Sequence, residues 1–146
     1  MGLYQSVIDS VGFVVALIAL IIVLVGLFVF LFGRVILFKK CGYESWKALI
    51  PFYGTYVFFC DICGLHWAWY VAYILIDGLT ASDTTIQFLN MFVKAMAFYN
   101  LAIRCNKDKI PSMIFGGIAS PIMTMVYALS NINYHPEIEV KQSGIF

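Results

Sequence analysis

The segment 60–66 reads Cys-Asp-Ile-Cys-Gly-Leu-His, which has the residue types and the close spacing of a metal-binding loop. Cys41 and Cys105 are predicted on the same side of the fold, so four thiols could converge there. A structural zinc site uses such ligands, but the sequence has no second Cys-x-x-Cys pair, and a free cysteine ordinarily behaves as a small apolar residue. We therefore predict no metal and no cofactor. The weak candidate ligands are Cys60, Cys63 and His66.

A polar stripe runs through an otherwise apolar segment. Gln87, Asn90 and Lys94 follow one another at steps of three and four residues, which places them on one face of a helix. A cation near the centre of a bilayer costs about 2.5 to 3.5 kcal/mol, so an intramembrane lysine is functional by default. Asp77, close to the end of the preceding apolar segment, is the natural partner of Lys94.

Three interpretations of this stripe stay open. The first is a structural pair of Lys94 with Asp77, or a lysine that snorkels along its own stem. The second is a polar lumen or a partner-binding face. The third is a slippage of the helix that brings Lys94 toward water.

The sequence contains no recognisable catalytic motif. The Gly-x-Ser-x-Gly elbow, the His-Glu-x-x-His zinc motif and the phosphate-binding loop are all missing. His66 and His135 are predicted near opposite faces, so they would not share a site. We therefore predict that the protein is not an enzyme, and an enzyme acting on lipid or peptide ranks third among the functions considered.

The elements that must position these residues are apolar helices. From Val11 to Gly33 the chain has 23 residues without a charged, amide or hydroxyl side chain. At about 1.5 Å per residue this run is about 34 Å long, enough to cross a hydrocarbon layer of about 30 Å. Hydrophobic residues make up 62% of the chain and charged residues 12%, and the mean hydropathy is +0.91. We interpret the run as a retained membrane anchor.

The apolar pattern predicts an all-α, integral membrane four-helix bundle that forms a single domain over residues 1–146. A short interfacial or re-entrant segment, residues 43–60, separates helices 1 and 2. The predicted helices cover about residues 11–38, 61–79, 86–104 and 110–129.

Basic residues set the predicted orientation, because loops rich in Lys and Arg stay in the cytoplasm. Seven of the nine Lys and Arg residues fall on one side of this arrangement: Arg34, Lys39, Lys40, Lys47, Arg104, Lys107 and Lys109. We therefore predict a multi-pass protein of a bacterial cytoplasmic (inner) membrane, with both termini outside. The net charge of +1 gives no reason to expect a nucleic-acid partner.

Two further groups of residues are predicted to shape the chain. Proline lacks a backbone donor and disfavours helix in the residue before it, so Pro51 should end a short surface helix and turn the chain. Trp46, Tyr53 and Tyr56 would hold this turn at the lipid headgroups, as a structural corner or as a re-entrant pore or ligand loop. In the last helix, small residues favour packing in the bundle or a self-association face, and a proline adds a kink: Gly116, Gly117 and Pro121.

Residues 42–56 read Gly-Tyr-Glu-Ser-Trp-Lys-Ala-Leu-Ile-Pro-Phe-Tyr-Gly-Thr-Tyr. This segment resembles the hallmark of an uncharacterised family of small bacterial multi-pass membrane proteins, a domain of unknown function with a Trp-x-x-x-Ile-Pro-x-Tyr type of motif. Gly54 stands where that family usually has Asn, and the resemblance spans roughly residues 38–134. It implies a small multi-pass fold and a bacterial origin, but no activity.

The sequence thus favours a small non-enzymatic membrane protein. Its predicted partners are the lipid bilayer and either a second copy of itself or another membrane protein. The alternative is an oligomeric ion channel or small-solute transporter whose polar path is lined by helix 3, where the charge of Lys94 would favour anions.

Overall fold

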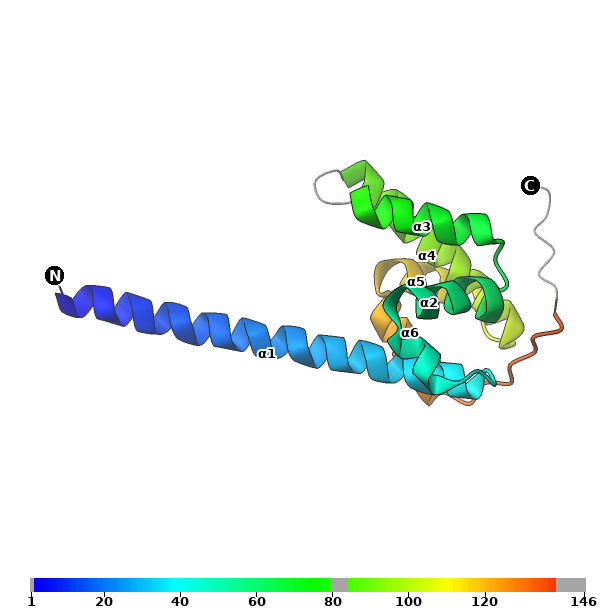
Figure 1. Cartoon of the computed structure of the whole chain (residues 1–146), viewed down its shortest axis with the longest axis horizontal. Helices are drawn as coiled ribbons and strands as arrows, with labels where there is room; N and C mark the ends of the chain where they lie inside the picture. Colours follow the sequence, from blue (N-terminus) through cyan, green and yellow to red (C-terminus); the bar gives the residue numbers. More distant parts are fainter. Residues whose placement is uncertain (1, 80–83, 139–146) are drawn as a thin grey trace.

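The computed structural model describes residues 2–79 and 84–138, and this part of the chain is all-helical, as predicted, without a strand. Six α-helices follow one another, with a short 3-10 helix and a π-helical turn between the first and the third (Figure 1). The bounds are α1 Gly2–Lys40, η1 Ser45–Leu49, α2 Pro51–Tyr56, η2 Val57–Ile62, α3 Trp67–Leu79, α4 Thr84–Arg104, α5 Lys109–Ile118 and α6 Ser120–Leu129.

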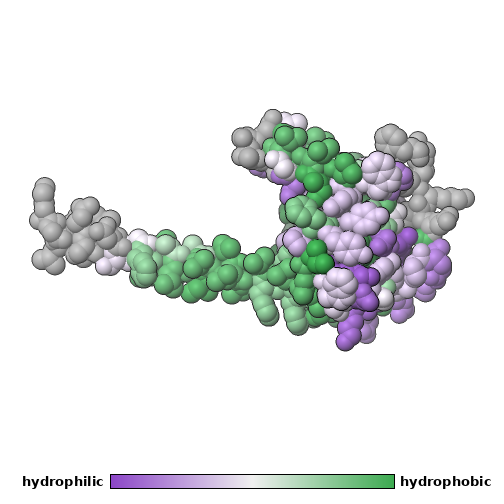
Figure 2. Space-filling model, in the orientation of Figure 1, coloured by the Kyte–Doolittle hydropathy of each residue, from purple (hydrophilic) through white to green (hydrophobic). Residues whose placement is uncertain are grey.

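Helix α1 is a rod that projects far beyond the rest of the molecule (Figure 1). Its 39 residues make a helix about 58 Å long. Its large side chains from Val11 to Phe28 are all exposed and apolar, and Figure 2 shows this part as a continuous hydrophobic surface. From Gly33 onward the helix enters the bundle, where Leu37 and Phe38 are fully buried in the single core cluster.

Two helices of the described part are long and apolar enough to cross a membrane, rather than the four predicted. They are α1 from Ser10 onward and α4, whose 21 residues span about 32 Å. Helix α3 has 13 residues, or about 20 Å, and its predicted start at residue 61 falls within η2 and the break before Trp67. The exposed surface of the bundle nevertheless carries many large apolar side chains on α2 to α6, which is typical of contact with lipid.

The segment predicted to be interfacial, residues 43–60, forms a corner between two short helices, η1 and α2. Helix α2 continues directly into η2, which ends at Ile62. Helix η1 ends at Leu49, Ile50 has an extended backbone, and Pro51 opens α2, where its missing donor costs nothing. At Gly54 an added Cβ atom would lie 2.5 Å from the carbonyl oxygen of Lys47. The close approach of η1 and α2 therefore requires glycine there.

The single helix predicted over 110–129 is wrong, because α5 and α6 are separate helices of ten residues each. The helix breaks at Ala119, whose φ of −130° and ψ of 54° are not helical. Pro121 causes this break: it has no N–H for the preceding turn and sits in the first turn of α6, so it starts a helix instead of kinking one. The hydroxyls of Ser112 and Tyr127, 2.7 Å apart, join the start of α5 to the end of α6 and show that the two form a hairpin.

The hairpin returns the chain to the end of the molecule from which it came. Lys40 Nζ donates a hydrogen bond to the carbonyl oxygen of Ser130 at 2.7 Å. The backbone N–H of His135 donates to the carbonyl oxygen of Arg104 at 2.9 Å. Residues 130–138 thus lie at the end that carries the basic turns, whereas the sequence predicted the tail on the opposite side. Residues 139–146, including Lys141, and the loop 80–83 lie outside the described residues.

This arrangement predicts which exposed positions share a side of the membrane. In a Cys60→Ser background, where the remaining native thiols are buried, single cysteines replace Ser10, Lys107 or Asn133. A membrane-impermeant maleimide should label the residue-107 and residue-133 variants from one side of the membrane and the residue-10 variant from the other side. Labelling of the residue-10 and residue-133 variants from the same side would contradict the hairpin return.

Candidate functional site

A small cavity lies where α1, the corner segment and α4 meet. Its volume is about 60 Å³. Helix α6 contributes two residues of its N-terminal half, and α3 contributes one aromatic ring. The lining residues are Phe30, Arg34, Thr55, Phe58, Phe59, Tyr73, Lys94, Ala97, Phe98, Ser120 and Thr124. The lining contains two cations, Arg34 and Lys94, and no carboxylate.

Arg34 is the cation that α1 brings to this cavity. It is buried, with 8% of its surface exposed, and its guanidinium carbon lies 5.3 Å from the ring centre of Phe30 and 5.9 Å from that of Phe58. Its hydrogen bond to Thr55 Oγ1 is long, at 3.5 Å, and that hydroxyl itself donates to Pro51. The sequence grouped Arg34 with the surface lysines. The signal that it differs is its position directly after the apolar run, five residues before the first lysine.

Lys94 reaches the cavity from the middle of α4, but not as a partner of Asp77. Its Nζ lies 5.7 Å from the ring centre of Tyr73, while Asp77 Oδ1 accepts a hydrogen bond from Asn90 Nδ2 at 3.0 Å. The two ion pairs in the described part both lie on the surface and involve neither residue. The predicted Lys94–Asp77 pair is therefore wrong, because the amide of Asn90 lies one turn nearer to Asp77. Gln87 is exposed and does not join this group.

The glycines of α5 pack inside the chain, against α4. A Cβ atom added at Gly116 would collide with the side chain of Phe98, and one at Gly117 would lie 3.0 Å from the carbonyl oxygen of Met91. Both glycines are buried, so they allow close approach of α4 and α5 and leave no free face for a second protein. Of the two interpretations left open for these glycines, the structure supports packing within the bundle.

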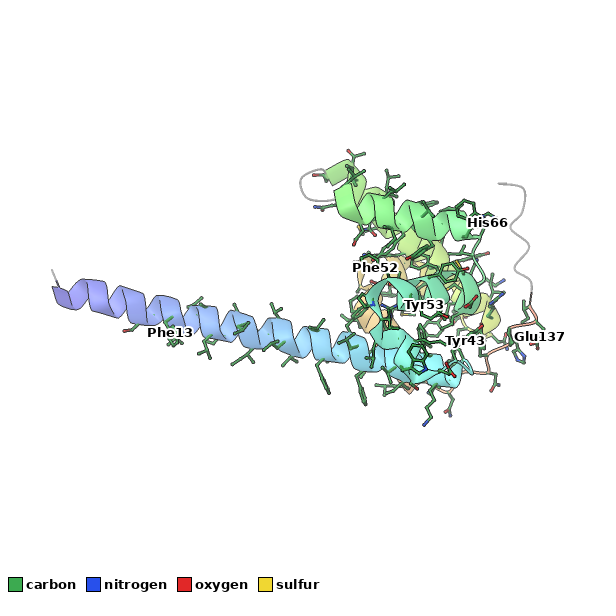
Figure 3. All side chains as sticks on the ribbon, in the orientation of Figure 1. Phe13, Tyr43, Phe52, Tyr53, His66 and Glu137 are labelled. Atoms are coloured by element: carbon green, nitrogen blue, oxygen red, sulfur yellow. The ribbon has the colours of Figure 1, made fainter. Side chains whose placement is uncertain are left out.

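The aromatic residues of the corner lie on the surface, as Figure 3 shows for Phe52 and Tyr53. Trp46, Tyr53 and Tyr56 are exposed, and the Trp46 indole donates to Glu44 at 3.1 Å. Tyr56 meets Tyr70 of α3 edge to face. These amphipathic rings are suited to a boundary between lipid and water.

A second polar cluster, the Arg104 junction, closes the basic end of the molecule. Arg104 Nη1 donates to the carbonyl oxygens of Asp61 at 2.6 Å and Ile62 at 3.1 Å, and Tyr134 Oη donates to the same two oxygens. These carbonyls end η2 and have no partner within the helix, so a cation there satisfies them and complements the helix dipole. The chain leaves η2 through Gly64, whose φ of +66° suits glycine.

Three of the four thiols lie buried near this junction. Cys41, Cys63 and Cys105 are buried in one core cluster, and all four cysteines are free. Burial raises the pKa of Cys41 to about 12 and that of Cys105 to about 11, so both stay protonated at neutral pH. No group of three or more His, Cys, Asp or Glu side chains in the described part is placed to hold a metal ion.

The two histidines lie at the same end of the molecule, which corrects the prediction of opposite faces. His66 follows Gly64, against which Arg104 packs, and the backbone N–H of His135 donates to Arg104. His66 Nδ1 accepts from the N–H of Ala68, and His135 Nδ1 lies 3.0 Å from Glu137, which places both rings in local surface contacts. Figure 3 shows His66 and Glu137 on this side.

No protein family model, no curated protein and no solved structure matches this chain. The resemblance of residues 42–56 to a domain of unknown function therefore stays a prediction.

Two glycines with positive φ provide a matched test of the Arg104 junction. Alanine at Gly42, φ +83°, meets no atom within 4 Å, whereas alanine at Gly64 collides with the Arg104 guanidinium. Each substitution should cost about 1 to 2 kcal/mol of backbone strain. Gly64→Ala should cost about 1.5 to 3 kcal/mol more, because it displaces a charged hydrogen-bond donor. Unfolding in detergent measures both, and equal losses would contradict the role given to Arg104.

The thiol environments predict a reaction order. At about pH 8 a thiol with a pKa of about 12 is ionised in about one molecule in ten thousand, and only the thiolate reacts. A maleimide should therefore modify the half-buried Cys60 first, and the buried thiols of Cys41, Cys63 and Cys105 only after unfolding. Mass spectrometry of the modified peptides reads the order. Rapid modification of Cys41 in the folded protein would contradict it.

Proposed function

We propose that this chain is a small, non-enzymatic, integral membrane protein of a bacterial inner membrane, and that it acts by assembly with a second copy or another membrane protein. The bare half of α1 would form the contact. This replaces the two contact faces that the sequence suggested, because the polar stripe of α4 and the glycines of α5 are used largely within the chain.

The observation that carries the proposal is a seam of small residues along α1. Gly12, Ala19, Gly26 and Gly33 recur every seven residues, so they share one face of the helix in a left-handed crossing. At Gly33 this face is occupied, because an added Cβ atom would lie 3.2 Å from the Met125 sulfur of α6. At Gly12 and Gly26 nothing lies within 4 Å. The same face that packs within the chain at one end is thus uncovered at the other.

In the membrane arrangement that we propose, α1 and α4 cross the bilayer in the same direction, α3 returns the chain between them, and α5 and α6 enter and return. Each of the latter is about 15 Å long, half of the hydrocarbon thickness. The basic end, with Lys39, Lys40 and Lys107, would face the cytoplasm under the positive-inside rule, together with residues 130–138. The start of α1 would then be outside.

The channel or transporter alternative has less support from the geometry. The cavity that Lys94 lines has a volume of only about 60 Å³, which is too small for a path through one chain. A path between chains would need the polar stripe on an outer face, but Asn90 is buried and bonded to Asp77.

The seam is tested with variants that do not disturb the chain's own packing. Gly26→Val adds bulk where nothing lies within 4 Å, and Val14→Phe adds bulk to the opposite, equally exposed face. We expect Gly26→Val to weaken self-association about tenfold, and Val14→Phe to leave it unchanged. Photobleaching of single labelled particles, both in vesicles of purified protein and in native membranes, counts the copies.

Each outcome has a defined meaning. A multimer in vesicles of purified protein identifies the partner as a second copy. A monomer in vesicles that forms a larger, Gly26-dependent complex in native membranes identifies another membrane protein. A monomer in both settings, or an equal effect of the two substitutions, would overturn the assembly proposal.

A further inference from the structure

We propose that the cavity between Arg34 and Lys94 binds one phosphate group, carried by a membrane lipid or present as inorganic phosphate. This inference does not depend on the assembly of α1. It rests on the charges, the donors and the size of the cavity, all of which belong to the bundle.

The positive charges that line the cavity are not balanced by a negative charge in its wall. Two cations line a cavity whose wall holds no carboxylate, and Arg34 is buried. Buried charges in proteins are normally paired, because an isolated charge loses its hydration without compensation. The aromatic rings around Arg34 and Lys94 offset part of this cost, since cation–π contacts contribute roughly 0.5 to 2 kcal/mol. An anion between the two cations would supply the rest.

Hydrogen-bond donors from Arg34, Lys94 and the start of α6 converge on the cavity. The Arg34 guanidinium has five N–H donors, and its one hydrogen bond within the described part is the long one to Thr55. A planar guanidinium binds phosphate oxygens in pairs, and a lysine adds a mobile point charge. Helix α6 begins at the cavity with Ser120 and has no side-chain cap, so the positive end of its dipole favours an anion there.

The size of the cavity and the apolar surfaces beside it suit one phosphate group. A cavity of about 60 Å³ has room for a single oxyanion and excludes a larger solute. Figure 2 shows the surface hollowed between α1 and α3, on the side where both present hydrophobic side chains. Leu75 and Leu79 of α3 are exposed on this helix, as are Leu24 and Leu27 on α1. Acyl chains of a lipid whose phosphate sits at Arg34 could extend along these surfaces.

The experiment compares three variants of the full chain. Lys94→Gln removes one cation from the half-buried edge of the cavity, and Lys94→Arg restores the charge. Lys107→Gln removes an exposed cation at the basic end and serves as the matched control. Native mass spectrometry counts lipid retained from nanodiscs that contain phosphatidic acid and phosphatidylcholine with the same acyl chains. Calorimetry in detergent measures the binding of inorganic phosphate.

Wild-type protein should retain phosphatidic acid or bind inorganic phosphate, Lys94→Gln should lose about tenfold or more in affinity, and Lys94→Arg should recover most of it. Retention of lipid alone identifies a lipid phosphate as the ligand, and binding of phosphate alone identifies the free ion. The proposal is overturned if wild type binds neither probe, or if Lys94→Gln binds as well as Lys107→Gln does.

Discussion

Two like charges, on Arg34 and Lys94, face one small cavity in this molecule. The position of Arg34 divides helix α1 into two parts. On the N-terminal side of Arg34, α1 is a bare apolar rod. On its C-terminal side the same helix is buried among the corner segment and α6. A guanidinium can occupy this boundary because aromatic rings and a hydroxyl replace part of its water, and a bound anion would replace more. The corner segment, α4 and the start of α6 all reach this point.

The other end of the bundle is closed by a different use of the same residue type. Arg104 satisfies the last carbonyls of η2, where the helix ends at Ile62 and the chain turns away at Gly64. Arg104 also binds the segment after α6. Its carbonyl oxygen accepts a hydrogen bond from the N–H of His135, and its Nη1 donates to Tyr134 Oη. One arginine thus joins the corner, the end of α4 and the segment after α6, which is why the hairpin return is compatible with a compact basic end.

Sequence patterns could predict what depends on local chemistry. The apolar run of α1, the all-helical class, the corner at Pro51 and the segment of α4 follow from composition and from proline's geometry. The break at Ala119 could not be read from hydropathy, because residues 110–129 contain no charged side chain and are mostly apolar. The signal for the break is Pro121, which we interpret from the sequence alone as a kink. The cavity was missed because Arg34 and Lys94 lie 60 residues apart, and only tertiary packing brings them together.

The lengths of α1 and α4 on either side of the cavity differ, and no single hydrocarbon layer matches both. Lys94 lies in the middle of α4, so about 15 Å of that helix extends to either side of the cavity. Arg34 faces the same cavity, yet about 36 Å of apolar helix extends from it toward Ser10. A hydrocarbon layer of about 30 Å centred on α4 leaves about 20 Å of α1 uncovered, and a layer placed on α1 leaves the apolar surface of α5 and α6 in the headgroups. Tilt reduces this mismatch only in part. We propose that the remaining length of α1 contacts a helix of another chain, because its seam of small residues is uncovered at Gly12 and Gly26.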